Sequence, residues 1–87
     1  MKINIYAVYD YKAEAYGNPL FFNTDALSER SFAEACANNQ TDLFKYPKDF
    51  ALYRIGEYDD ATGEVQNLEP NKLICEAIKY NKEELQA

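Results

Sequence analysis

The residues best suited to bind a ligand lie close together in the middle of the chain. Single-stranded nucleic acid is bound by aromatic rings that stack on bases and by cationic groups that bind phosphates. Both kinds of group occur in or beside KYPKDFALYRIGEYDD, residues 45–60. The candidate nucleic-acid-binding residues are Lys45, Tyr46, Lys48, Tyr53 and Arg54. We expect the first three to be exposed just before the strand, and Arg54 to hold its guanidinium in solvent from mid-strand. The acidity of the whole chain favours an alternative, in which the rings belong to a core strand and the charges line its edge.

Other chemistries find little support in the sequence. The chain has no histidine, which removes the commonest general base and the usual zinc ligand. Its two cysteines, Cys36 and Cys75, are too far apart in sequence to form a structural zinc site, and we expect them to be buried free thiols. The three glycines do not have the spacing of a phosphate-binding loop. The sequence therefore predicts a protein that is not an enzyme, with no catalytic residue, cofactor or metal.

Acidic side chains gather in the segment YDDATGE, where Asp59, Asp60 and Glu64 could hold a hard cation. Their spacing does not match an EF-hand loop, so solvated turn residues are the simpler interpretation. The chain as a whole has a formal net charge of −6, which argues against simple electrostatic binding to DNA or to an anionic membrane. Residues 42–56 are the one locally basic part of this acidic protein.

The length of 87 residues leaves room for a single domain. We expect this domain to span residues 1–80, with a polar tail over 81–87. No apolar run approaches the roughly 18 residues of a membrane span, and the first residues do not resemble a signal peptide. We expect the protein to remain in the compartment where it is made, without a membrane partner.

Hydrophobic periodicity predicts an α+β fold. Residues 2–9 alternate as a strand does, and a less regular strand is expected to end at Phe22. A helix is expected after Thr24, whose hydroxyl can cap its first turn. A long strand over residues 49–58 and a short return strand over 64–68 flank a turn, and Pro70 is expected to break the chain.

Residues 72–80 fit either a strand or a helix, and their shortness favours a strand. The elements together predict an antiparallel sheet of four to five strands with one helix packed across a face. Five apolar residues are expected to share the core: Ile5, Phe32, Leu52, Ile55 and Ile78. Because such a sheet leaves edges to cover, we also expect self-association, with a two-fold dimer favoured.

Several stretches of the chain resemble one family of phage proteins. They are MKINIYAVYD, the Tyr-Gly-x-Pro turn before an aromatic pair, RSF in the expected helix, YPKDFALYRIGEYDDATGE and the late EAI. Together they resemble the small nonstructural protein of gokushovirus-type microviruses, which are phages with single-stranded DNA genomes. The resemblance runs from Met1 to about Tyr80, and its most specific pattern is Tyr-Pro-x-Asp-Phe-x-Leu-Tyr-x-Ile-Gly at residues 46–56.

This resemblance implies a non-enzymatic accessory protein in replication and packaging of a single-stranded DNA genome. It implies a place in the host bacterial cytoplasm, outside the mature virion, and brings no catalytic residues with it. Two hypotheses follow. The protein contacts single-stranded DNA, or its acidic surface docks on the phage replication initiator, the procapsid or a host replication protein without touching DNA.

Overall fold

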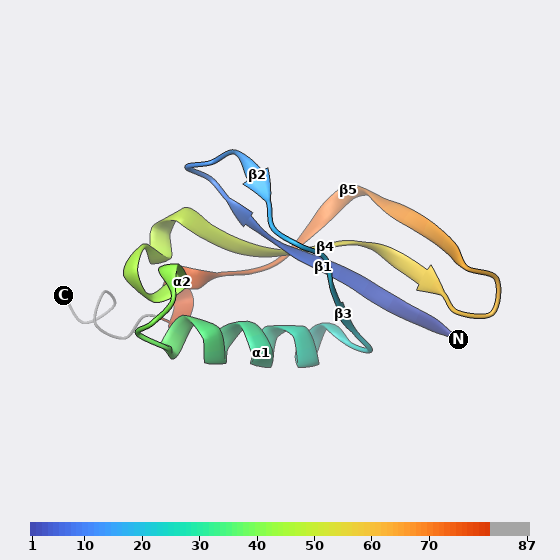
Figure 1. Ribbon diagram of the computed structural model, residues 1–87, viewed down its shortest axis with the longest axis horizontal. Coiled ribbons are helices and arrows are strands. Elements are labelled where there is room, and N and C mark those ends of the chain that lie inside the picture. Colours follow the sequence, from blue (N-terminus) through green and yellow to red (C-terminus); the bar gives the residue numbers. More distant parts are fainter. Residues whose placement is uncertain (81–87) are drawn as a thin grey trace.

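Three long antiparallel strands form the frame of the molecule, and the main helix lies along one side of them (Figure 1). The computed structural model describes residues 1–80; the polar tail expected over 81–87 lies outside the described residues. The strands are β1 (Lys2–Asp10), β2 (Ala15–Tyr16), β3 (Leu20–Phe22), β4 (Phe50–Asp59) and β5 (Glu64–Glu76). The helical segments are α1 (Asp25–Ala37), α2 (Asp42–Lys45) and two 3-10 turns, η1 (Pro47–Asp49) and η2 (Ala77–Tyr80).

The strands form one antiparallel sheet in the order β2-β1-β4-β5, and β3 pairs with β1 as well. The prediction of an α+β fold, with an antiparallel sheet and one main helix across a face, is confirmed. Strands β4 and β5 are antiparallel neighbours that follow each other in sequence, so a short turn is enough to connect them. In that turn Gly63 has a φ of 77°, a left-handed conformation that favours glycine.

Helix α1 begins where the sequence predicts. The Thr24 hydroxyl accepts a hydrogen bond from the backbone N–H of Leu27 at 3.1 Å, and Asp25 occupies the positive end of the helix dipole. The buried face of the helix consists of Ser28, Phe32 and Cys36, which are four residues apart. This spacing places them on one stripe against the sheet.

The core between α1 and the sheet differs in part from the prediction. Phe32 and Leu52 share it, as expected, with the fully buried Tyr6. Ile5 is also buried, but it alternates with Tyr6 and points to the opposite face of β1. Ile55 and Ile78 are only partly buried. The predicted shared core was therefore wrong for these three isoleucines. The remaining members of the buried cluster are Cys36, Cys75 and Ala77.

Pro70 does not break the chain, contrary to the prediction. It follows a cis peptide bond and lies inside β5, which continues to Glu76. Strand β5 is at the edge of the sheet, and its register with β4 is irregular between the pairs Gly56–Asn67 and Arg54–Lys72. A residue without a backbone N–H is tolerated in such a place. The strand interpretation of residues 72–80 holds up to Glu76, after which η2 turns against α1.

A β-bulge at Ile55 divides the sheet into two halves. In the register between β1 and β4, Ile5 pairs with Gly56 and Tyr6 with Arg54, so Ile55 is an extra residue on β4. Beyond this point the β4–β5 hairpin extends past the first turn of α1, together with the start of β1 (Figure 1). We call this part of the sheet the distal arm, residues 2–5, 56–59 and 64–67. The sheet face that α1 does not cover is called the open face.

Candidate nucleic-acid interface

Lys45, Tyr46 and Lys48 lie at the junction of α2 and η1, where the backbone is firmly held. The Thr41 hydroxyl accepts from the N–H of Phe44 and so caps α2. The Tyr46 carbonyl accepts from the N–H of Asp49 at 3.0 Å. The buried ring of Pro47 anchors the junction. We call Lys45, Tyr46 and Lys48 the Tyr46 strip.

The strip is open to solvent, as the sequence predicted. All three residues are exposed, and Tyr46 has 57% of its surface accessible. A hollow of about 240 Å³ is lined by the strip together with Pro47 and Asp49. An exposed ring on a fixed backbone is able to stack on a base with little ordering of the protein.

The charges around Tyr46 have both signs. A second hollow of about 410 Å³ is lined by Tyr46, Lys12, Phe50 and three aspartates. These are Asp10, Asp42 and Asp49. The carboxylates reduce the local positive potential, so phosphate contacts here depend on the lysine ammonium groups reaching outward.

Tyr53 lies on the other side of the sheet from the Tyr46 strip. It alternates with Phe50 and Leu52, which pack on the core, and so it belongs to the open face. There it packs edge-on against Tyr9 and Tyr16. Its hydroxyl is 2.8 Å from that of Tyr11, and this hydrogen bond raises the pKa of Tyr53 to about 12.

Arg54 is engaged with acidic side chains beneath the sheet. We expected its guanidinium to lie in solvent, but its side chain is only 22% exposed. It lies 3.8 Å from the carboxylates of both Asp25 and Glu57. The expectation was wrong because Arg54 faces the first turn of α1, where the carboxylate of Asp25 attracts it. A phosphate would have to displace these carboxylates.

The structure thus brings together three of the five candidates and separates two. The Tyr46 strip is one surface, Tyr53 is on the open face, and Arg54 is in an ion-pair network. The structure adds Lys12, which lies in the turn after β1 and shares a hollow with Tyr46. Sequence reasoning missed Lys12 because only tertiary pairing connects this turn to η1, through the N–H of Tyr11 and the carbonyl of Asp49 at 2.8 Å.

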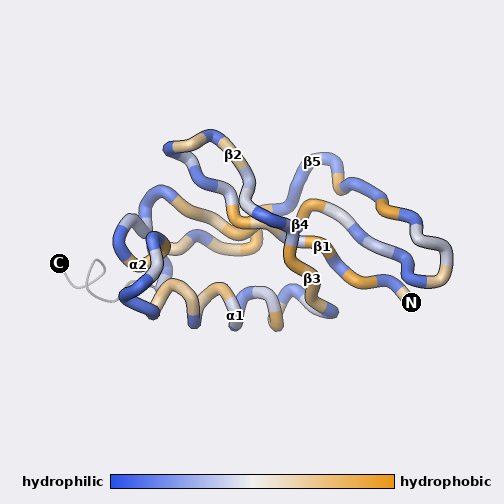
Figure 2. The backbone as a smooth tube through the Cα atoms, viewed as in Figure 1, coloured by the Kyte–Doolittle hydropathy of each residue, from blue (hydrophilic) through white to orange (hydrophobic). Residues whose placement is uncertain are grey.

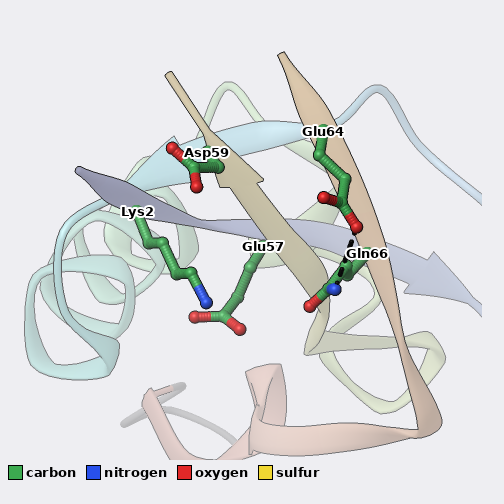
Figure 3. Close-up of a pocket in the computed structure, with 5 residues that line it drawn as sticks. All are labelled: Lys2, Glu57, Asp59, Glu64 and Gln66. Carbon is green, nitrogen blue, oxygen red and sulfur yellow. Dashed lines mark hydrogen bonds between the residues drawn. The ribbon is translucent and has the colours of Figure 1, made fainter. Parts of the chain in front are cut away.

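Acidic side chains dominate the α1 side of the distal arm. Lys2, Glu57, Asp59, Glu64 and Gln66 line a small hollow there (Figure 3). Asp59 also accepts a hydrogen bond from the backbone N–H of Ala61, which is a turn role. Among residues 1–80, no group of three or more Cys, Asp or Glu side chains is arranged to hold a metal ion.

Helices within the described part of the chain are all too short or too polar to cross a membrane. The two cysteines are buried free thiols, and burial raises the pKa of the Cys36 thiol to about 11. Such thiols are poor nucleophiles.

Comparison with known proteins identifies a family. Searches of curated proteins and of solved structures found no significant match. The model of the Phage ORF5 protein family matches residues 3–80, which include all of the sheet except Lys2, together with α1 and the Tyr46 strip. The chain therefore belongs to the Phage ORF5 protein family, and it is a small phage accessory protein.

Proposed function

We propose that this protein is a non-enzymatic, nonstructural accessory factor of a gokushovirus-type microvirus. In this proposal it acts in the host bacterial cytoplasm during replication and packaging of the single-stranded DNA genome, and it contacts single-stranded DNA through the Tyr46 strip. The observation that carries the DNA contact is the exposed ring of Tyr46 between two exposed lysines on a fixed backbone. Family membership supports the phage setting.

The physical argument rests on stacking more than on charge. A base stacked on an aromatic ring contributes about 1–3 kcal/mol, whatever its sequence. Lys45 and Lys48 add phosphate contacts, and Lys12 lies beside the same ring. Repulsion from the acidic residues elsewhere is screened beyond about 10 Å at 0.1 M salt. We therefore expect weak, sequence-independent binding that requires low salt.

The test is titration of a labelled single-stranded oligonucleotide at low and at moderate salt. Tyr46→Ala should weaken binding by about 1–3 kcal/mol. The double variant Lys45→Gln with Lys48→Gln should weaken binding and reduce the salt slope by about 0.7 for each lost phosphate contact. Lys2→Gln, an exposed lysine of the distal arm, is the matched control. Equal affinity of all these variants would remove the Tyr46 strip from the proposal.

A second candidate is favoured by the acidic surface of the distal arm. Glu57, Asp59 and Glu64 present three carboxylates on one side of it (Figure 3). Such a surface suits a basic partner, for which the phage replication initiator, the procapsid and host replication proteins are the proposed sources. The test is binding of the purified replication initiator to the wild type and to the double variant Glu57→Gln with Glu64→Gln. This candidate is favoured if the initiator binds the wild type but not the variant, and if the wild type has no affinity for oligonucleotides.

A further inference from the structure

The distal arm is apolar on the side that faces away from α1. On its α1 side lie the paired residues Lys2 and Asp59, and next to them Glu57 with Gln66. Successive residues of a strand point to opposite faces. The residues that alternate with these along each strand therefore lie on the open face of the arm. These are Ile3, Ile5, Phe21, Tyr58 and Val65, joined by the pairs Ile3–Tyr58, Ile5–Phe21 and Tyr58–Val65.

The same face continues past the pair Gly56–Asn67, in which Asn67 is polar, over the other half of the sheet. There the sheet curls, and the Tyr16 hydroxyl of β2 accepts a hydrogen bond of 3.0 Å from the Asn71 side chain of β5. There the paired residues are Tyr9 with Tyr16 and Tyr53 with Leu73. Among the paired residues of the open face within 1–80, only Glu76, opposite Ala51, carries a charge. Figure 2 shows hydrophobic residues in β3 and, in alternation with hydrophilic ones, in the first half of β1. The strand pairing assigns Ile3, Ile5 and Phe21 among them to the open face.

This arrangement is the reverse of what a solvated sheet face requires. In an antiparallel sheet with one uncovered face, the residues of each strand usually alternate so that the polar ones lie on the uncovered face. Here Phe21 is 54% exposed and Val65 is 58% exposed, on the face that no described element covers. Contiguous apolar surface of this kind marks an interaction site.

The charge distribution selects the occupant of this face. Single-stranded DNA needs cations for its phosphates, and the paired residues of the open face within 1–80 supply none. A basic protein would be attracted to the acidic α1 side of the arm instead. A second copy of this chain offers the same uncharged surface, and face-to-face packing directs both acidic sides outward.

We propose that the open face binds the open face of a second copy, in a two-fold dimer of sheet against sheet. Strands β1, β4 and β5 abreast at about 4.8 Å, over about ten residues of 3.3 Å, give roughly 480 Å² of projected area, and the short strands β2 and β3 add to its edge. These edge residues and the side-chain relief raise the area towards the roughly 800 Å² per partner of a standard interface. Two packed sheets lie about 10 Å apart. This dimer does not depend on DNA contact, because the Tyr46 strip lies outside the paired face.

The experiment uses neighbouring residues of β5 that point to opposite sides. Sedimentation equilibrium of the wild type at about 1–100 µM should show a species of twice the 10.0 kDa chain mass. Val65→Lys places a charge in the interface and should weaken the dimer at least about tenfold. Gln66→Lys adds the same charge on the α1 side and should leave the dimer as in the wild type. Circular dichroism melts establish that both variants are folded.

Phe21→Ser, which changes an exposed residue of β3, provides a second interface variant with no added charge, and it should also weaken the dimer. The proposal is overturned by a wild type that is monomeric throughout this range. It is equally overturned if folded Val65→Lys and Phe21→Ser both dimerise like the wild type. Dissociation of the dimer by a single-stranded oligonucleotide would assign the face to DNA instead.

Discussion

The hydroxyl of Tyr6 donates a hydrogen bond of 2.6 Å to the carboxylate of Asp25, and it does so from a residue that is fully buried. This bond joins the middle of β1 to the first turn of α1. Lys72 from β5 donates to the other carboxylate oxygen at 3.0 Å, and the Arg54 guanidinium lies 3.8 Å from the oxygen that accepts from Tyr6. One carboxylate therefore connects α1 to β1, β4 and β5.

Tyr6→Phe keeps the ring in the core and removes this hydrogen bond. We expect a loss of about 1.5–3 kcal/mol in the free energy of unfolding, because the acceptor is charged. Urea denaturation measures it. A double-mutant cycle with Asp25→Asn isolates the pair, since the two changes should not be additive. Additive losses would show that the bond contributes no coupling.

Stability should fall in acid because of two carboxylates. The pKa of Asp25 is lowered from its ordinary value of 3.8, chiefly by the hydrogen bond from Tyr6. The pKa of Glu29 is lowered from 4.5, chiefly by the hydrogen bond from Tyr80. The ordinary pKa values apply to the unfolded state and the lowered ones to the folded state. Between them the unfolded state binds more protons than the folded state, so stability rises with pH in this interval.

The stabilisation from these two groups is therefore complete above pH about 5 and is lost as the pH falls through the folded-state pKa values. Denaturant titrations between pH 7 and pH 2.5 measure this loss. The double variant Asp25→Asn with Glu29→Gln serves as the reference, and it should lose less stability over the same interval. A wild type whose acid dependence equals that of the variant would contradict the assignment.

Phe32→Ala should destabilise the fold by about 3–5 kcal/mol, because the ring is 4% exposed and central in the core. In a domain of this size that loss is enough to unfold much of the population. Thermal melts followed by circular dichroism measure the effect. Leu27→Ala on the same helix, where the side chain is 37% exposed, is the control and should cost less than about 1 kcal/mol.

Gly56→Ala should separate β4 from β5 in the distal arm. A methyl group at Gly56 would lie 2.5 Å from the backbone carbonyl oxygen of Gln66, which cannot move without breaking the strand pairing. We expect a loss of about 1–3 kcal/mol. Gly17→Ala is the control, since its methyl group would have its nearest contact at 3.6 Å. Amide hydrogen exchange of Gln66 and Asn67 would report the local effect.

Local patterns in the sequence predict the elements of this fold but not how their faces are assigned. Alternation in residues 2–9 and the cap at Thr24 act within a few residues, so they predict β1 and α1 well. The long strand β4 alternates in both registers, and the bulge at Ile55 leaves no local signal. For this reason the sequence could not assign Ile55 to the correct side. Ile5 was misassigned because β1 has apolar residues on both faces, so its alternation does not tell which face meets α1.

The candidate site shows the same division between local and tertiary information. Exposure of the Tyr46 strip follows from Pro47 and from its position between two elements, which the sequence reveals. The burial of Arg54 depends on the approach of Asp25 from 29 positions earlier in the chain, and the contribution of Lys12 depends on the packing of a turn against η1. Those contacts are products of tertiary structure.

The bulge at Ile55 also limits how the length of this chain can change. Before it, residues 50, 52 and 54 face α1; after it, residues 57 and 59 do. Inserting or removing one residue between it and the β4–β5 turn would exchange the acidic and apolar sides of β4 beyond that point. Removing Ile55 itself would only restore the regular alternation, because Tyr6–Arg54 and Ile5–Gly56 are already successive pairs. Length changes between the bulge and the turn should therefore preserve the two faces only when they come in steps of two residues. Relatives of different length in this segment should differ by even numbers.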